Sequence, residues 1–136
     1  MSWGLMANQA WDFPADRLGY MTGFAAELNE PLWTWRYGFF QMPRNSNGTA
    51  LDQHFLQAWG MIAEVERRFA VATHPVALRL LTYLNQAQMG SYGDAVFNPT
   101  RPAEFSATRA FLKKYGVGLN LEQELLRDVG VFSRAG

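Results

Sequence analysis

Two histidines, His54 and His74, are the first side chains in the sequence that could bind a metal ion or transfer a proton near neutral pH. His54 has no histidine or carboxylate three or four residues further on, the spacing that places two ligands on one helix face. His74 directly precedes Pro75, where it is better explained as the start of a helix. Neither histidine belongs to an H-E-x-x-H or E-x-x-H motif. The sequence therefore predicts structural roles for both, and neither a metal site nor a cofactor.

The carboxylates and hydroxyls give equally weak catalytic signals. Glu64 is followed three and four residues later by Arg67 and Arg68, the usual spacing of ion pairs on a solvated helix face. Ser91 lies among glycines, but not at the G-x-S-x-G spacing of a nucleophile elbow. There is no cysteine, which excludes thiolate nucleophiles and disulfides. The sequence favours a non-enzymatic protein, although a catalytic site assembled by tertiary proximity stays open.

The charge balance bears on the class of partner. The formal net charge is zero, whereas a nucleic-acid-binding domain is expected to carry a clearly basic face. Lys113 and Lys114 are the two lysines, so arginine supplies the other ten of the twelve basic residues. Protein interfaces enrich arginine, methionine and the aromatic residues and deplete lysine. GC-rich coding would produce the same arginine bias, but it does not explain the five tryptophans.

Apolar residues at spacings of three and four predict that the elements are helices. The strongest such pattern runs from Leu51 to Phe69, after the loop of residues 43–48. Further helices are expected over residues 14–29, 75–87, 102–115 and 120–129, with a second loop at 90–102. Gly116 fits the cap of the fourth helix, after Lys113 and Lys114. The predicted fold is an all-α single domain, residues 1–136, with four or five helices and an irregular apolar N-terminal arm, residues 1–13.

Residues 32–42 support two interpretations. Trp33, Trp35, Tyr37 and Phe39 alternate with other residues, which is typical of a strand with one aromatic face. Trp33, Tyr37 and Phe40 also fit a helical spacing. A single strand without a partner is not stable, so the sequence favours helix or irregular structure here.

Half of the aromatic residues fall within residues 1–42, more than a small helical core needs to cover itself. We therefore expect a structural or interaction subunit that contacts a protein partner or another copy through this region. The candidate contact residues are Trp3, Leu5, Met6, Trp11, Trp33, Trp35 and Tyr37. The same rings could instead simply wrap the core.

Two other classes of function remain open. One is a small helical enzyme or ligand-binding domain, with an aromatic pocket near Trp33, Trp35, Tyr37 and His54. The other is a helix-turn-helix protein that reads DNA with residues 121–128, where three acidic residues would oppose phosphate. No basic segment followed by an apolar stretch opens the chain, and no apolar run is long enough for a membrane helix. The expected location is cytoplasmic, without membrane contact.

Overall fold

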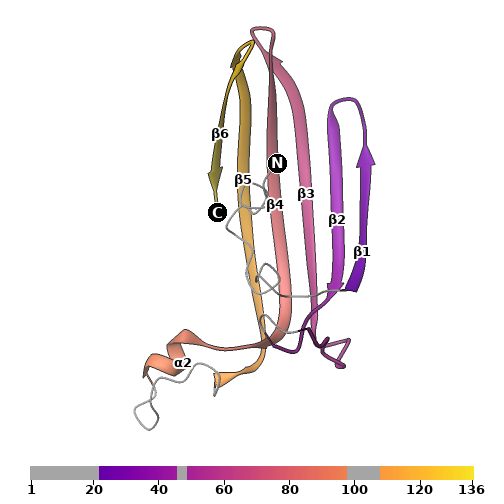
Figure 1. Cartoon of the computed structure of the whole chain (residues 1–136), viewed down its shortest axis with the longest axis vertical. Helices are drawn as coiled ribbons and strands as arrows, with labels where there is room; N and C mark the ends of the chain where they lie inside the picture. The colour runs from indigo at the N-terminus through magenta and orange to yellow at the C-terminus, as the bar shows by residue number, and fades with distance from the viewer. Residues whose placement is uncertain (1–21, 46–48, 98–107) are drawn as a thin grey trace.

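The computed structural model describes residues 22–45, 49–97 and 108–136, and these form one antiparallel sheet instead of the predicted helical bundle. The strands are β1 (Thr22–Asn29), β2 (Trp33–Gln41), β3 (Trp59–Val71), β4 (His74–Met89), β5 (Ala110–Leu126) and β6 (Val129–Ala135). One short helix, α2 (Tyr92–Phe97), lies between β4 and β5. Each strand pairs with the next along the chain, so the sheet order is β1-β2-β3-β4-β5-β6 (Figure 1).

The connections differ between the two ends of the sheet. At one end the strands turn within a few residues: 30–32, 72–73 and 127–128. At the other end lie the long connections between β2 and β3 and between β4 and β5, the latter containing α2 (Figure 1). Ala72 and Thr73 form the β3–β4 turn with φ angles of 47° and 77°. A two-residue hairpin turn of this kind demands left-handed backbone, which non-glycine residues adopt at a cost.

The predicted helices were wrong because a spacing of four residues fits a strand as well as it fits a helix. Every second strand residue shares a face, so positions four apart coincide in both structures. Val65 and Phe69, which appeared to continue a helix, lie on one face of β3, while the beginning of that predicted helix is the loop before β3. Residues 75–87 belong to β4, and residues 120–129 lie in β5, the following turn and the start of β6.

The structure confirms one of the two interpretations of residues 32–42 and contradicts the remaining helix predictions. Residues 33–41 form strand β2, so the strand interpretation of this stretch was right and the preference for helix was wrong. Within 14–29 the described part is strand β1, and within 102–115 the described part leads into β5. Gly116 is not a helix cap, because it lies within strand β5. The Tyr83 side chain covers it, and a Cβ added at Gly116 would lie 2.5 Å from Tyr83 Cε1.

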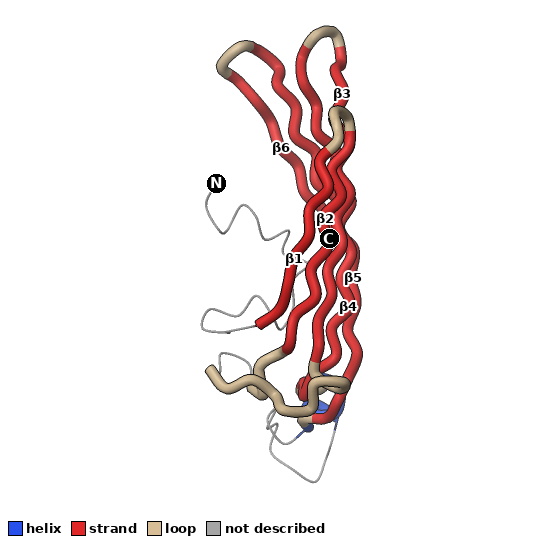
Figure 2. Tube along the Cα trace, turned by 90° about the vertical axis from the view of Figure 1, so that its right-hand side faces the viewer, coloured by secondary structure: helices blue, strands red, loops and turns tan. Residues whose placement is uncertain are grey.

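The described residues have a small core. Figure 2 shows the strands edge-on as a single layer. The buried cluster consists of Met42, Ala58, Ala87 and Met89, with Phe111 and Leu112 packed against it, at the end where the long connections meet the sheet. The larger part of the sheet therefore carries side chains that this cluster does not cover. In the described ranges 22–45, 49–97 and 108–136, we find no helix with the length and apolar character that crossing a membrane requires.

Candidate functional interface: two sheet faces of opposite chemistry

The strand register divides the side chains of the sheet between two faces. Because successive strand residues point to opposite sides, directly paired residues share a face. The apolar face comprises Phe24, Ala26, Leu28, Trp33, Trp35, Tyr37, Phe39, Trp59, Met61, Ala63, Val65, Phe69, Val71, Val76, Leu78, Leu80, Leu84, Tyr115, Val117, Leu119, Leu121 and Val131. The polar face carries Glu27, Asn29, Thr34, Arg36, Glu64, Glu66, Arg68, Arg79, Asn120, Glu122 and Arg134, together with the apolar side chains of Phe40, Ile62, Leu81, Tyr83 and Phe132.

The apolar face continues across all six strands and is exposed. Phe24 on β1 is 59% exposed, Trp35 on β2 52%, Leu80 on β4 51% and Val117 on β5 63%. Ala26, Ala63 and Thr82 leave an open hollow of about 450 Å³ between the larger side chains. A continuous exposed apolar surface of this kind is a candidate site of contact with another molecule.

Aromatic rings reinforce the β1–β3 side of the apolar face. The Phe39 ring lies 6.1 Å from that of Phe24 and 6.0 Å from that of Trp59, stacked with both. Trp33 and Trp35 stack at 6.0 Å, and the Arg67 guanidinium lies 4.5 Å from the centre of the Trp33 ring. Such pairs fix the ring orientations, because offset stacking and cation–π contacts are directional.

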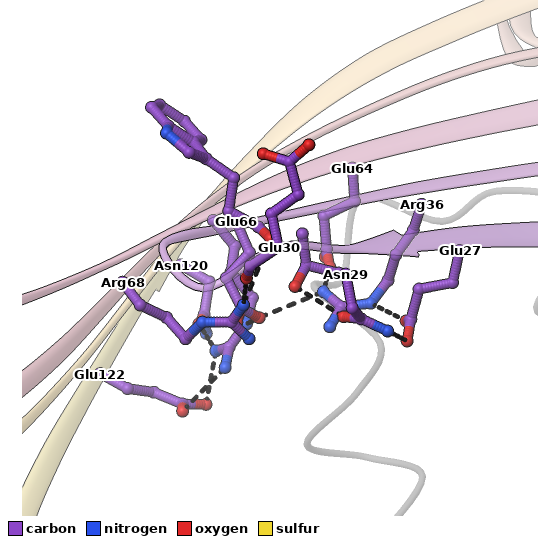
Figure 3. A network of polar contacts seen from close by, with 12 residues as sticks. Glu27, Asn29, Glu30, Arg36, Glu64, Glu66, Arg68, Asn120 and Glu122 are labelled. Atoms are coloured by element: carbon purple, nitrogen blue, oxygen red, sulfur yellow. Dashed lines mark hydrogen bonds and ion pairs between the residues drawn. The ribbon is translucent and has the colours of Figure 1, made fainter.

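Glu66 is the centre of the polar face (Figure 3). It is 4% exposed, and its Oε2 accepts hydrogen bonds from Arg79 Nε at 2.7 Å and from Arg36 Nη1 at 3.1 Å. Arg68 Nη1 lies 3.2 Å from its Oε1. Three guanidinium groups from three strands therefore converge on one buried carboxylate, and charge-assisted bonds of this type are stronger than neutral ones.

The network extends to both sides of Glu66. Arg36 also donates from Nε to Glu27 at 2.5 Å and from Nη1 to Glu64 at 2.6 Å. Arg79 Nη1 donates to Asn120 Oδ1 at 2.7 Å and lies 2.8 Å from Glu122 Oε1. These contacts form an ionic ladder that links β1 to β5 across the sheet (Figure 3). It consists of Glu27, Arg36, Glu64, Glu66, Arg79, Asn120 and Glu122. Its members satisfy one another, which is the condition for stabilisation by a partly buried ionic network.

The pKa values follow from these contacts. Burial alone would raise the pKa of Glu66, but hydrogen bonds from Arg79 and Arg36 outweigh burial and hold that pKa below the ordinary 4.5. Burial would lower the pKa of Arg36, yet Glu27, Glu64 and Glu66 keep it above its usual value. The pKa of Glu27 is lowered chiefly by the hydrogen bond from Asn29 and then by the bond from Arg36. Glu27, Arg36 and Glu66 are therefore ionised near neutral pH.

His54 lies in the connection between β2 and β3, away from the predicted aromatic pocket. Its Nδ1 lies 2.8 Å from Asp52 Oδ1, and its ring meets Phe111 edge-on at 5.7 Å. The hollow on the apolar face is lined by Trp35 and Tyr37 but not by Trp33 or His54, so the structure does not bring the four residues of the predicted pocket together. Within the described ranges, no three His, Asp or Glu residues gather closely enough to hold a metal ion.

The predicted contact residues divide into two groups. Trp33, Trp35 and Tyr37 all lie on the apolar face, as their alternation indicates. Trp3, Leu5, Met6 and Trp11 fall outside the described residues. Leu78, Leu80, Val117, Leu119 and Leu121 alternate in the same way and lie on the same face, so the apolar face extends beyond the N-terminal third to which the sequence confined the predicted contact residues.

The premise of the DNA-binding alternative does not hold, since residues 110–126 form one continuous strand where two helices and a turn were required. Comparison of the chain with protein-family profiles, with curated proteins and with solved structures gives no match.

Proposed function

We propose that this chain is a non-enzymatic structural segment of a membrane-embedded protein, with its apolar sheet face against lipid hydrocarbon and its polar face toward water. The observation that carries the proposal is the segregation of charge. Among the described strand residues, Arg67 and Lys113 are the two lysines or arginines that the register places on the apolar face, and no aspartate or glutamate joins them. A membrane-spanning sheet requires this alternation of lipid-facing apolar and water-facing polar side chains.

The free-energy cost of exposing apolar side chains to water indicates that an apolar environment covers the apolar face. A fully buried large apolar side chain contributes about 1.5–3 kcal/mol, so one left half exposed forgoes about 1 kcal/mol. More than ten side chains on this face are exposed to that degree or nearly so, a combined loss of roughly 10 kcal/mol. That loss is as large as the whole stability of a typical domain. The sheet therefore needs an apolar environment on this side.

The length of the strands favours lipid as the environment of the apolar face. β4 has 16 residues and β5 has 17, whereas strands of globular proteins usually have about five or six. About ten residues suffice for a strand to cross a bilayer. On β4 the apolar face runs from Leu84 to Val76, roughly 27 Å at about 3.4 Å per residue, close to the thickness of the hydrocarbon layer. Gln86 and His74 flank this run on the same face.

Hydrogen bonding is compatible with lipid across the interior of the sheet. The inner strands pair on both sides, so their backbone groups are satisfied within the sheet, as an apolar solvent requires. β1 and β6 are the edges of the described sheet, and neither carries the lysine or proline that protects free edges. Both edges therefore need further strands, from the same chain or from a copy of it. The expected protein or homo-oligomer partner fits at these edges.

Two neighbouring residues of β6 provide a matched test. Val131 lies on the apolar face and is 48% exposed, and Phe132 lies on the polar face and is 59% exposed. Val131→Lys places a charge on the apolar face level with Val76, at the end of the apolar run, where it costs up to about 1 kcal/mol, so flotation with phosphatidylcholine vesicles should fall by up to about fivefold. Phe132→Lys, at the same depth on the opposite face, should float like the unchanged protein. Equal flotation of the two variants would contradict the proposal.

A second copy packed face to face is the alternative cover. Trp33, Trp35 and Tyr37 would then serve as the predicted protein-contact residues, without membrane contact and consistent with the expected cytoplasmic location. In that case the protein would stay out of vesicles, and Val131→Lys would convert a dimer to a monomer in light scattering. The length and charge segregation of the strands favour lipid, so the proposal departs from the expectation of no membrane contact.

A further inference from the structure

We propose that Arg67, whose guanidinium lies over the Trp33 ring, binds the phosphate of an anionic phospholipid at the surface of the bilayer. This inference rests on the proposed function, because it assigns a lipid headgroup to the one arginine that the described strands place on the apolar face. It identifies a ligand site and the class of its ligand.

The ion-pairing pattern of the neighbouring arginines sets Arg67 apart. Arg36, Arg68 and Arg79 each lie within 4.0 Å of Glu66 on the polar face. Arg67 is on the opposite face, where no carboxylate of the described residues lies within ion-pair distance. Its guanidinium lies on the same face as Val65 and Phe69, and an arginine in contact with lipid requires an anionic partner.

The contact with Trp33 orients the guanidinium. Arg67 Cζ lies 4.5 Å from the centre of the indole ring, and that ring is stacked in turn on Trp35. A guanidinium in contact with an aromatic face keeps its N–H edge free to donate, and that edge matches the two oxygens of a phosphate. Trp33 is the first residue of β2 after the turn at 30–32. Its partner Arg67 pairs with Leu78, next to the end of the apolar run at Val76, and a long arginine side chain at that position extends toward the headgroups. A tryptophan near a strand end is typical of the layer where lipid headgroups meet hydrocarbon.

Anionic lipid fits this site better than zwitterionic lipid. In phosphatidylcholine the choline group compensates the phosphate charge, whereas phosphatidylglycerol leaves it uncompensated. One basic residue near an anionic bilayer surface contributes an attraction equivalent to about a fivefold preference. Arg67 should therefore select phosphatidylglycerol over phosphatidylcholine by about that factor.

The test is native mass spectrometry of the protein released from vesicles of equal parts phosphatidylglycerol and phosphatidylcholine. The unchanged protein should retain phosphatidylglycerol about fivefold over phosphatidylcholine. Arg67→Gln should abolish the preference, and Arg67→Lys, which keeps the charge, should retain part of it. Arg134→Gln is the matched control, because the Arg134 guanidinium also lies over an aromatic ring, Phe132 at 5.2 Å, but on the polar face. It should leave the preference unchanged.

Two outcomes would overturn the inference and leave the proposed function intact, and a third would contradict the proposed function. An unchanged lipid preference in Arg67→Gln, with normal flotation, would remove the site and leave the apolar face in lipid. Loss of bound phosphatidylglycerol on adding millimolar inorganic phosphate would identify a general anion site instead of a lipid site. Failure of the unchanged protein to float would contradict the proposed function itself.

Discussion

Trp35 and Arg36 are adjacent on β2 and point to opposite faces of the sheet. The Trp35 indole is 52% exposed on the apolar face, while the Arg36 guanidinium bonds to Glu27, Glu64 and Glu66 on the polar face. The same alternation recurs along β3, β4 and β5. Each strand therefore helps to build an apolar surface and an ionic ladder at once, and the following expectations come from these two surfaces.

Removing the charge of Glu66 should destabilise the sheet. Glu66→Gln leaves Arg36, Arg68 and Arg79 without their shared carboxylate. Breaking a buried ionic contact costs about 3–5 kcal/mol, and the partial exposure of two of the arginines reduces the expected loss to about 2 kcal/mol. Denaturant unfolding in one fixed detergent, followed by tryptophan fluorescence, measures it. Glu64→Gln is the control, with an expected loss below about 1 kcal/mol because Glu64 binds Arg36 alone in the described network. Equal losses would remove Glu66 from the centre of the network.

The lowered pKa of Glu66 predicts sensitivity to acid. The pKa of Glu66 lies below 4.5 in the folded state. Ionised Glu66 therefore contributes fully to the free energy of unfolding above pH 4.5, and this contribution is lost as the pH falls through the pKa of Glu66 in the folded state. The free energy of unfolding should stay nearly constant between about pH 7 and pH 5 and then decline. In Glu66→Gln the decline should be shallower. An identical pH dependence in the two proteins would show that other carboxylates control acid unfolding.

The β3–β4 turn is a site where stability can be gained. Ala72 and Thr73 both have positive φ, a conformation that asparagine and glycine adopt more readily. Replacing the pair by Asn-Gly should raise the free energy of unfolding by about 1–2 kcal/mol. The β5–β6 turn is the control, since neither Arg127 nor Asp128 has a positive φ. Placing Asn-Gly there should give no gain, and a gain in the control alone would contradict the assigned turn geometry.

Gly116 should not tolerate a side chain while Tyr83 is present. A Cβ at Gly116 would lie 2.5 Å from Tyr83 Cε1, whereas one at Gly93 would meet Ser91 Oγ at 3.8 Å. Gly116→Ala should cost about 1–3 kcal/mol, and Gly93→Ala should cost much less. Adding Tyr83→Ala should make the Gly116→Ala change nearly neutral, which a double-mutant cycle of unfolding free energies measures. Additive costs would mean that the ring does not cover Gly116.

Local sequence patterns could predict only part of this structure. The alternation from Trp33 to Phe39 correctly indicates an aromatic strand face. The sequence nevertheless favours helix for this stretch, because the local pattern reveals no partner strand. The partner positions Met61, Ala63 and Val65 were assigned to a helix, since the apolar residues around them also occur at helical spacings. Strand pairing depends on distant residues, and a local period does not reveal it.

The ionic ladder could not be predicted from the sequence either, because strand pairing brings its residues together from distant positions. Glu64 was matched to Arg67 and Arg68 by helical spacing, yet in the sheet it binds Arg36, and Arg67 lies on the other face. The two arginines that donate to Glu66 Oε2 lie 30 and 13 residues away in the sequence. Only the strand register brings these charges together.

The most direct test of a lipid-facing sheet uses single cysteines along β5, which is straightforward because the chain has no native cysteine. Spin labels at residues 115 and 117 to 121 of the protein in phosphatidylcholine vesicles, with Gly116 left out because Tyr83 covers it, are probed with oxygen, which partitions into lipid, and with a water-soluble nickel chelate. Labels at Tyr115, Val117, Leu119 and Leu121 should collide with oxygen and not with nickel, and labels at the residues between them should lack this oxygen contact. An apolar face that is accessible to nickel, or shielded from both reagents, would contradict contact with lipid.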